Sequence, residues 1–122
     1  MVSRFVVHHH KTGRPHFDLR LIQNDLLRCW SLLKEPPQVK GERRLAVERE
    51  SFPPDALHAS RFAEDAFGPG RVYTWDEGGV ELESESPRLL VLTFMGQKLT
   101  GRYELRQMRW YPGNRWLLGK AS

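Results

Sequence analysis

Near the start of the chain, two imidazoles and a carboxylate are spaced so that they could bind one metal ion. His16, Asp18 and Arg20 alternate with apolar residues, so in a strand their side chains project from one face. His10 precedes them, and a short loop over residues 11–15 can bring its ring beside the others. Two histidines and one aspartate suit Mn²⁺, Fe²⁺ or Zn²⁺ and leave coordination positions open for a substrate.

The presence of Arg20 beside these ligands indicates that the substrate is a phosphate. Arg20 lies one step beyond Asp18 on the same face, where it could neutralise a phosphate bound to the metal. An ion pair within the protein is the other interpretation of this arginine. His8 and His9 complete the run of three histidines, and we expect them to lie beside the site or at the surface. A solvated edge strand is the alternative to a metal site at this stage.

The composition limits the classes of protein to which the chain can belong. Its 122 residues have the length of one domain, which we expect to span residues 1–122. The longest apolar runs, such as residues 89–92, are too short to cross a bilayer, and no secretory signal is visible, so we expect a cytoplasmic protein without membrane association. The one cysteine excludes an internal disulfide and a multi-cysteine zinc site. The net charge of +4 suits a polyanionic partner.

The apolar pattern around these residues is mostly short and alternating, which is typical of strands. Turn-forming residues separate the apolar segments at regular intervals. This pattern favours the mainly β class, with a compact closed β-barrel of about six to eight short strands and one or two short helical segments. We expect strands at residues 4–7, 16–22, 26–32, 45–48, 71–75, 89–94, 99–106 and 116–119, and helical turns at residues 55–64.

Turn residues indicate how some of these strands are joined. Gln23, Asn24 and Asp25 predict the turn of a hairpin between the second and third expected strands. Residues 95–98 predict a second hairpin turn. The glycines within residues 76–79 predict that the strand beginning at Arg71 ends there.

The first motif closely resembles the 3′-phosphoesterase domain of bacterial and archaeal DNA ligase D. Members of that family carry a histidine and, six residues later, the pattern His-aromatic-Asp-x-Arg-Leu, as in His10 and residues 16–21 of this chain. The resemblance continues in order along nearly the whole chain, which is identified as a stand-alone, minimal member of the family. The further matching motifs lie at residues 4–7, 27–34, 43–47, 67–76, 97–102 and 116–120.

This resemblance implies a β-barrel with a basic groove that trims 3′ ends in non-homologous end joining. Members of the family remove a 3′ ribonucleoside and then a 3′ phosphate, which leaves a 3′-OH end. The implied cofactor is Mn²⁺, with other divalent metals as alternatives. The family's metal ligands match His10, His16 and Asp18. Its phosphate-contacting, catalytic residues match Arg20, Lys34 and Arg44.

Two positions depart from the family pattern. The family carries a histidine and, four residues later, a tyrosine, where this chain has Phe52 and Ala56. The lost imidazole would contact the scissile phosphate, and phenylalanine can neither donate a proton nor form a charge-assisted hydrogen bond. His58 could enter the site from a shifted loop, and a surface position is the other interpretation. The alternative function is therefore a catalytically impaired module that binds 3′ ends and recruits a repair polymerase or ligase.

Basic residues elsewhere are candidates for contact with a nucleic-acid backbone, namely Lys98 and Arg102, together with His58. For Arg102, an ion-pair ladder along its own strand is an equally good interpretation. The expected partners are 3′ ends of DNA, with or without a terminal ribonucleotide, and a repair ligase or polymerase acting in trans. We expect a monomer. A phosphoesterase acting on a small phosphorylated molecule is a third candidate function.

Overall fold

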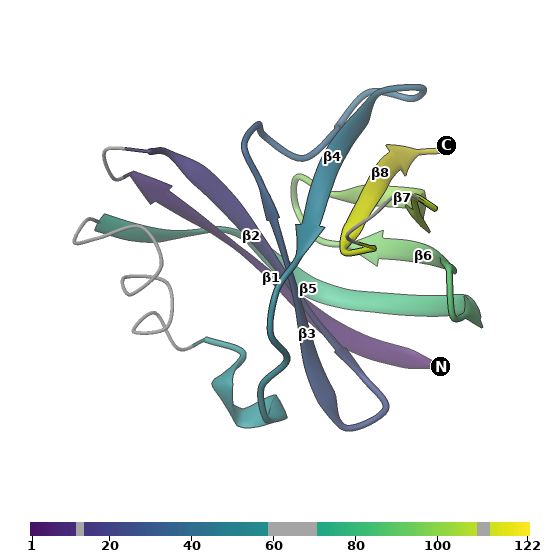
Figure 1. The fold of residues 1–122 in the computed structure, drawn as a ribbon, viewed down its shortest axis with the longest axis horizontal. Coiled ribbons are helices and arrows are strands. Elements are labelled where there is room, and N and C mark those ends of the chain that lie inside the picture. Colours follow the sequence, from purple (N-terminus) through teal and green to yellow (C-terminus); the bar gives the residue numbers. More distant parts are fainter. Residues whose placement is uncertain (12–13, 59–70, 110–112) are drawn as a thin grey trace.

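The computed structural model describes residues 1–11, 14–58, 71–109 and 113–122. Eight antiparallel strands form a closed barrel in the order β1-β2-β3-β4-β8-β7-β6-β5 (Figure 1). The strands are β1 (Val2–Lys11), β2 (His16–Gln23), β3 (Leu26–Leu32), β4 (Arg43–Glu48), β5 (Arg71–Ser86), β6 (Leu89–Met95), β7 (Thr100–Gln107) and β8 (Arg115–Lys120).

This architecture confirms the expected mainly β class and the closed barrel. Within the described ranges, the helical structure is one short 3₁₀ turn, η1 (Pro54–Ala56). The helical segment expected at residues 55–64 is therefore represented by η1, and its part from residue 59 onward lies outside the described residues. Among the described helical segments, none has the length and apolar character needed to cross a membrane.

The expectation that a strand ends at residues 76–79 is wrong, because β5 continues through them to Ser86. Gly79 pairs with Arg4 on β1 and also with Met95 on β6, so β5 is paired along both edges from this point to Glu81. A Cβ atom on Gly78 would lie 2.5 Å from the carbonyl oxygen of Met95. The glycines therefore allow a close approach of two backbones inside a continuing strand, which is a known role of glycine in sheets.

The barrel interior is filled by large apolar side chains to which every strand contributes. Phe5 packs edge-on against Phe94, and Trp30 packs in the same way against Trp116. Alternate residues of a strand face opposite sides of the sheet. The residues between these core positions therefore lie on the outer wall of the barrel.

A second apolar cluster fixes the segment around η1 against this outer wall. Ala56 and Leu57 pack against Val6 of β1 and against Leu27 of β3 and its neighbours. Leu27 and Phe52 exchange two backbone hydrogen bonds of 2.8 and 2.9 Å. The residues from Phe52 to Leu57 therefore have a defined position over β1, β2 and β3.

The turn between β6 and β7 is organised by one buried carboxylate. Asp76 of β5 accepts hydrogen bonds from the backbone N–H groups of Gln97 (2.9 Å), Lys98 (3.1 Å) and Leu99 (2.7 Å). A side chain at Gly96 would collide with this carboxylate. Residues 96–99 thus form the hairpin turn that the sequence predicts, tied to β5 by Asp76.

Replacing Asp76 with alanine should lower the free energy of unfolding by about 3 kcal/mol, because three backbone donors lose a charged acceptor. Denaturant unfolding followed by tryptophan fluorescence measures the change. The control Glu104→Ala removes an exposed carboxylate from β7 and should change the free energy by less than about 0.5 kcal/mol. Equal, small effects of the two substitutions would contradict the role given to Asp76.

Candidate metal centre

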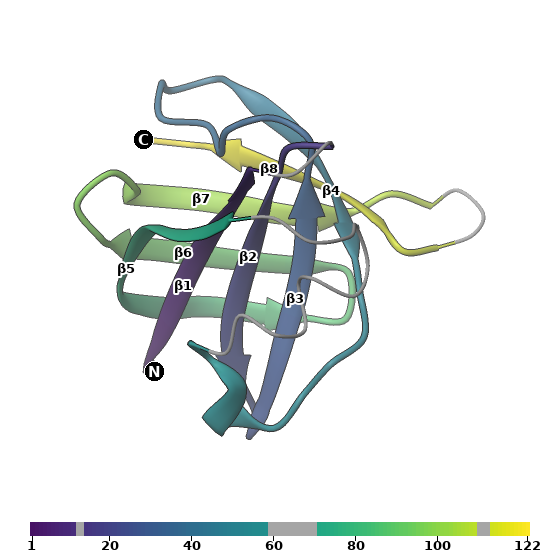
Figure 2. The ribbon, with the colours of Figure 1, turned by 90° about the vertical axis from the view of Figure 1, so that its left-hand side faces the viewer.

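Strands β1, β2 and β3 lie side by side (Figure 2), and their register brings polar residues into one patch on the outer wall. His10 of β1 pairs with His16 of β2. Two residues further along the strands, His8 pairs with Asp18, which also pairs with Ser31 of β3. The residues between these positions belong to the core or the opposite face. The outer wall therefore carries three imidazoles, one carboxylate and one hydroxyl in adjacent positions.

His10, His16 and Asp18 face one another within this patch. Oδ2 of Asp18 lies 2.9 Å from Nε2 of His10 and 3.3 Å from Nε2 of His16. The two imidazoles are buried and stacked, with ring centroids 4.3 Å apart. One nitrogen from each ring and one carboxylate oxygen lie within 4.8 Å of one another. Among the described residues, neither ring nitrogen of His10 has a well-aligned hydrogen-bond partner. The arrangement fits a divalent metal ion placed between the three groups.

Neighbouring groups orient two of these three side chains. The carbonyl oxygen of Arg14 lies 3.1 Å from Nδ1 of His16, which must donate to it, so in the neutral ring Nε2 carries the lone pair and can serve as a metal ligand. The hydroxyl of Ser31 donates to Oδ1 of Asp18 at 2.7 Å. Nε of Arg49 in turn donates to the Ser31 hydroxyl at 3.3 Å. Such contacts fix ring tautomers and carboxylate orientation in metal sites.

The pKa of Asp18 is lowered and the pKa of His16 is raised by their contact. Burial alone would raise the pKa of Asp18, but His10, His16 and Ser31 face its carboxylate and lower the pKa well below the usual range. Burial lowers the pKa of His16, but the neighbouring Asp18 carboxylate outweighs it and raises the pKa overall. Asp18 is therefore ionised at neutral pH and available as a ligand.

His8 is the remaining imidazole of the patch and is not one of the three candidate metal ligands. It is 3% exposed, and its Nδ1 has no hydrogen-bond partner among the described residues. Burial, aided by the nearby charge of Arg20, lowers the pKa of His8 to about 4. His8 is therefore neutral at pH 7. His9 points to the other face and stacks on Phe17, with ring centroids 4.1 Å apart.

Arg20 lies on the same face as Asp18, but its guanidinium is buried, with the residue 4% exposed. Its Nη1 donates to the carbonyl oxygens of Ala56 at 3.0 Å and of Leu57 at 3.3 Å. Arg20 therefore holds the η1 segment against the outer wall and places a positive charge near Asp18. The partners of Nη1 are backbone carbonyl oxygens, so these contacts differ from the ion pair that is the other interpretation of this arginine.

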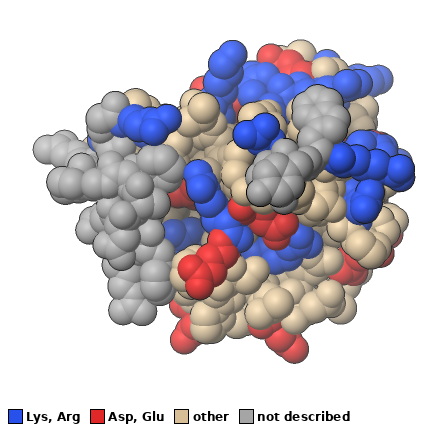
Figure 3. Space-filling view, in the orientation of Figure 1, with Lys and Arg blue, Asp and Glu red and all other residues tan. Residues whose placement is uncertain are grey.

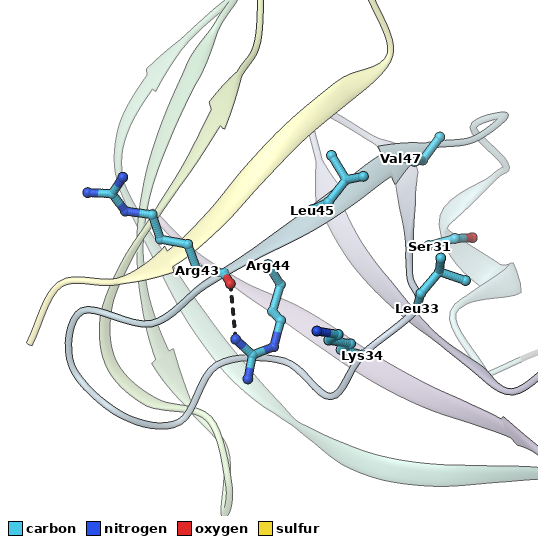
Figure 4. A pocket seen from close by; sticks show the side chains of 7 residues that line it. All are labelled: Ser31, Leu33, Lys34, Arg43, Arg44, Leu45 and Val47. Carbon is cyan, nitrogen blue, oxygen red and sulfur yellow. Dashed lines mark hydrogen bonds between the residues drawn. The ribbon is translucent and has the colours of Figure 1, made fainter.

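Lys34 and Arg44 line one groove beside the candidate metal centre (Figure 4). Ser31 lines the same groove and donates its hydroxyl hydrogen to Asp18, so it connects the two regions. Nε of Arg44 donates to the carbonyl oxygen of Glu35 at 2.8 Å. The structure thus brings Lys34, which follows β3, and Arg44 of β4 together, one and two strands away from Asp18.

The three residues expected to hold a nucleic-acid backbone each contact a side chain of β5. His58 is exposed, with Nε2 3.3 Å from Oε1 of Glu77, and it is close enough to His8 to contribute to lowering that residue's pKa. Lys98 places its Nζ 4.7 Å from the ring centre of Trp75. Arg102 lies on β7, far around the barrel from β2, with Nε 3.2 Å from a carboxylate oxygen of Glu83. The ion pair of Arg102 is therefore with a residue of β5, whereas the alternative interpretation expects a ladder along its own strand; within that strand, Glu104 pairs with Arg106.

The two positions that depart from the family pattern lie over the outer wall. Phe52 is half-buried and packs against the second apolar cluster. Ala56 is buried, and its carbonyl oxygen accepts from Arg20. Neither side chain offers a polar atom. His58 is the nearest imidazole along the chain and lies on the solvent side of this segment.

Sequence reasoning missed Ser31 and Arg49, and it left the position of His8 open. The signal for Ser31 was present, because counting back from the turn at Asn24 and Asp25 places it opposite Asp18. Arg49 follows β4, and its contact with Ser31 depends on how β4 pairs with β3, which local sequence patterns do not specify.

The buried His8 should make stability depend on pH in the metal-free protein. Its folded-state pKa of about 4 lies below the usual 6.5, so the unfolded chain binds a proton that the folded chain does not. The contribution of His8 to the free energy of unfolding is fully present above pH 6.5 and is lost as the pH falls toward 4. The free energy of unfolding falls when the pH is lowered from 7 to 4.5. This fall should therefore be about 2 to 3 kcal/mol smaller in His8→Gln than in the wild type.

Denaturant unfolding in EDTA at the two pH values measures this difference. The exposed His58 provides the control, since His58→Gln should leave the pH dependence close to that of the wild type. The same pH dependence in wild type and His8→Gln would show that His8 is not held neutral in the folded state.

Comparison with known proteins identifies sequences similar to most of the chain. The profile of the family described as DNA Ligase D 3′-phosphoesterase domain matches residues 8–107. The chain is 32% identical to the multifunctional non-homologous end joining protein LigD of Mycolicibacterium smegmatis, over 94% of this chain and 16% of that protein. It is 31% identical to the protein of the same description from Pseudomonas aeruginosa, over 88% of this chain and 14% of that protein. The chain spans about a sixth of the length of the curated relatives it matches.

Proposed function

The chain belongs to the DNA ligase D 3′-phosphoesterase domain family, and we propose that it is a metal-dependent phosphoesterase that processes 3′ ends in DNA repair. Its reaction would remove 3′ ribonucleosides, 3′ phosphates or both and leave 3′-OH ends. The observation that carries the proposal is the convergence of His10 and His16 on one carboxylate oxygen of Asp18. A ligase or polymerase would be the partner that uses the 3′-OH end.

His10, His16 and Asp18 would hold the metal ion, with Mn²⁺ as the first candidate. The support is a donor set of two buried imidazole nitrogens and one half-buried carboxylate oxygen, together with the ionised state of Asp18. When bound, such an ion polarises a phosphate oxygen and lowers the pKa of a coordinated water.

The chain's own cations would act on the phosphate. Lys34 and Arg44 line the groove next to the centre, where they can offset charge on the phosphate oxygens. Arg20 adds a buried positive charge near Asp18 while it holds the η1 segment in place. Phe52 supplies no proton donor, so we infer that the leaving oxygen receives its proton from another group or from water.

The second candidate function is a module that binds 3′ ends without cleaving them. The apolar packing of Phe52 favours it, because the position at which the family carries an imidazole is part of a hydrophobic cluster here. Binding alone would not distinguish the two functions, since both use the metal and the cationic groove. Turnover in the presence of the metal distinguishes them.

Incubation with Mn²⁺ and a primer–template ending in a 3′ phosphate or one 3′ ribonucleotide should produce a 3′-OH end. Asp18→Ala should reduce the rate by at least about 100-fold, because the metal loses a charged ligand. The control Asp55→Ala removes an exposed carboxylate of η1 and should retain the rate. Gel electrophoresis of the labelled primer measures the conversion.

Mn²⁺ binding followed by electron paramagnetic resonance gives a second readout. Wild-type protein that binds Mn²⁺ and the 3′ end without conversion would reject the enzyme and support the binding module. Equal conversion by the wild type and Asp18→Ala would reject the assignment of this site. Wild type and Asp18→Ala with the same Mn²⁺ affinity would reject the assigned ligands.

Ser31→Ala should weaken Mn²⁺ binding about tenfold, because Asp18 loses the hydroxyl donor that orients its carboxylate. The exposed Ser51 provides the control, and Ser51→Ala should bind Mn²⁺ as the wild type does. Titration followed by electron paramagnetic resonance gives both affinities. Unchanged affinity in Ser31→Ala would mean that the hydroxyl does not position the ligand.

A further inference from the structure

A groove of about 290 Å³ lies on the outer wall between β4 and the segment that follows β3 (Figure 4). Leu33, Leu45 and Val47 give it apolar surface. Leu33 is 69% exposed and Leu45 is 47% exposed, so both leave apolar area in contact with solvent. Two exposed leucines in one concave region favour an occupant that has apolar surface of its own.

The same groove is cationic. Lys34, Arg43 and Arg44 line it, and no acidic residue does so within the described part of the chain. Lys34 and Arg43 form no ion pair with a described residue, whereas Arg44 has its Nη2 3.6 Å from a carboxylate oxygen of Glu42. Figure 3 shows Lys and Arg side chains gathered on the upper part of the face that β4 and β8 form. The occupant should therefore combine apolar surface with negative charge, as a nucleotide does.

The strand register joins this groove to the candidate metal centre. Asp18 of β2 pairs with Ser31 of β3, and Ser31 pairs with Val47 of β4. Neighbouring strands are just under 5 Å apart, so Val47 lies about 10 Å from Asp18 along the wall. Arg43 and Leu45 alternate along β4 with the same parity as Val47 and face the same way. A strand whose phosphate lies at the centre can therefore continue into the groove.

We propose that the groove binds the nucleotide on the 5′ side of the scissile phosphate. Its sugar and base contact Leu33, Leu45 and Val47, and its own 5′ phosphate lies beside Arg43, whereas Lys34 and Arg44 act on the scissile phosphate. This inference rests on the proposed function and specifies the substrate of the same site. The groove selects a polynucleotide 3′ end over a small phosphate ester, because only the polynucleotide extends beyond the reacting phosphate.

The positive charge of the groove indicates which part of the substrate it binds, the nucleotide on the 5′ side of the scissile bond or the nucleoside on its 3′ side. A nucleoside released from the 3′ end carries no phosphate beyond the bond that is cut, so it gives Arg43 no partner, while Lys34 and Arg44 act on the scissile phosphate itself. The nucleotide on the 5′ side carries a further phosphate, and each neutralised phosphate contributes to affinity through the release of counterions. An apolar lining beside Arg43, which forms no ion pair with a described residue, therefore matches the 5′ side.

Equilibrium binding of a primer–template that ends in a 3′-OH tests this assignment, because this product occupies the 5′ side and cannot be hydrolysed. Leu45→Asp and Leu33→Asp each place a carboxylate beside the bound strand and should weaken the affinity at least about fivefold in fluorescence anisotropy. Arg43→Gln should reduce the slope of log affinity against log salt by about 1. The control Leu26→Asp makes the same change at a 50% exposed leucine at the other end of β3 and should bind as the wild type does.

Unchanged affinity in both Leu45→Asp and Leu33→Asp would overturn the inference. Kinetics give a second test, because Leu45→Asp should raise KM for substrates ending in a 3′ phosphate and in a 3′ ribonucleotide alike. A rise confined to the ribonucleotide substrate would overturn the inference, since it would place the released nucleoside in the groove. A wild-type protein that neither binds Mn²⁺ nor turns over the substrate would contradict the proposed function. That result is distinct from the effects of the groove variants.

Discussion

The two-residue turn between β2 and β3 sets the register on which the rest of the site depends. Asn24 and Asp25 have φ angles of 53° and 61°, the left-handed conformation of a type I′ turn, whose twist matches that of paired strands. From this turn the pairing runs without interruption to Asp18 and Ser31. A slip of one residue would turn Asp18 into the barrel and expose the apolar residues beside it. The core and the polar patch therefore require the same register.

Within that register, the groups around Asp18 compensate one another. A buried carboxylate is unfavourable by itself, and here two imidazoles and a hydroxyl face it. The two imidazoles that help to keep Asp18 ionised are those that a divalent ion would join. Arg20 contributes from the side, because its contacts with the η1 segment hold a positive charge within reach of the patch.

Alternation and turn chemistry were enough to predict the mainly β class, the closed barrel and the hairpin that carries Asp18. The family comparison confirms the resemblance found in the motifs. The path of β5 could not be predicted, because the pair Gly78 and Gly79 is also typical of a turn, and only the approach of β6 shows that the strand continues. The burial of Arg20 could not be predicted either, since it depends on the carbonyl groups of a segment more than thirty residues away. Local patterns specify which residues share a face, whereas contacts between distant segments determine burial and charge.

In β2 the outward-facing residues carry the candidate chemistry, and the inward-facing residues Phe17, Leu19 and Leu21 pack the core. The chain therefore assigns folding and chemistry to separate, interleaved sets of positions. Drift in one set need not disturb the other, so a substitution such as phenylalanine for a polar group over the wall is compatible with an intact barrel. A correctly folded relative can thus be an active enzyme or a domain that has lost its reaction, and thermal stability is no guide to which of the two it is.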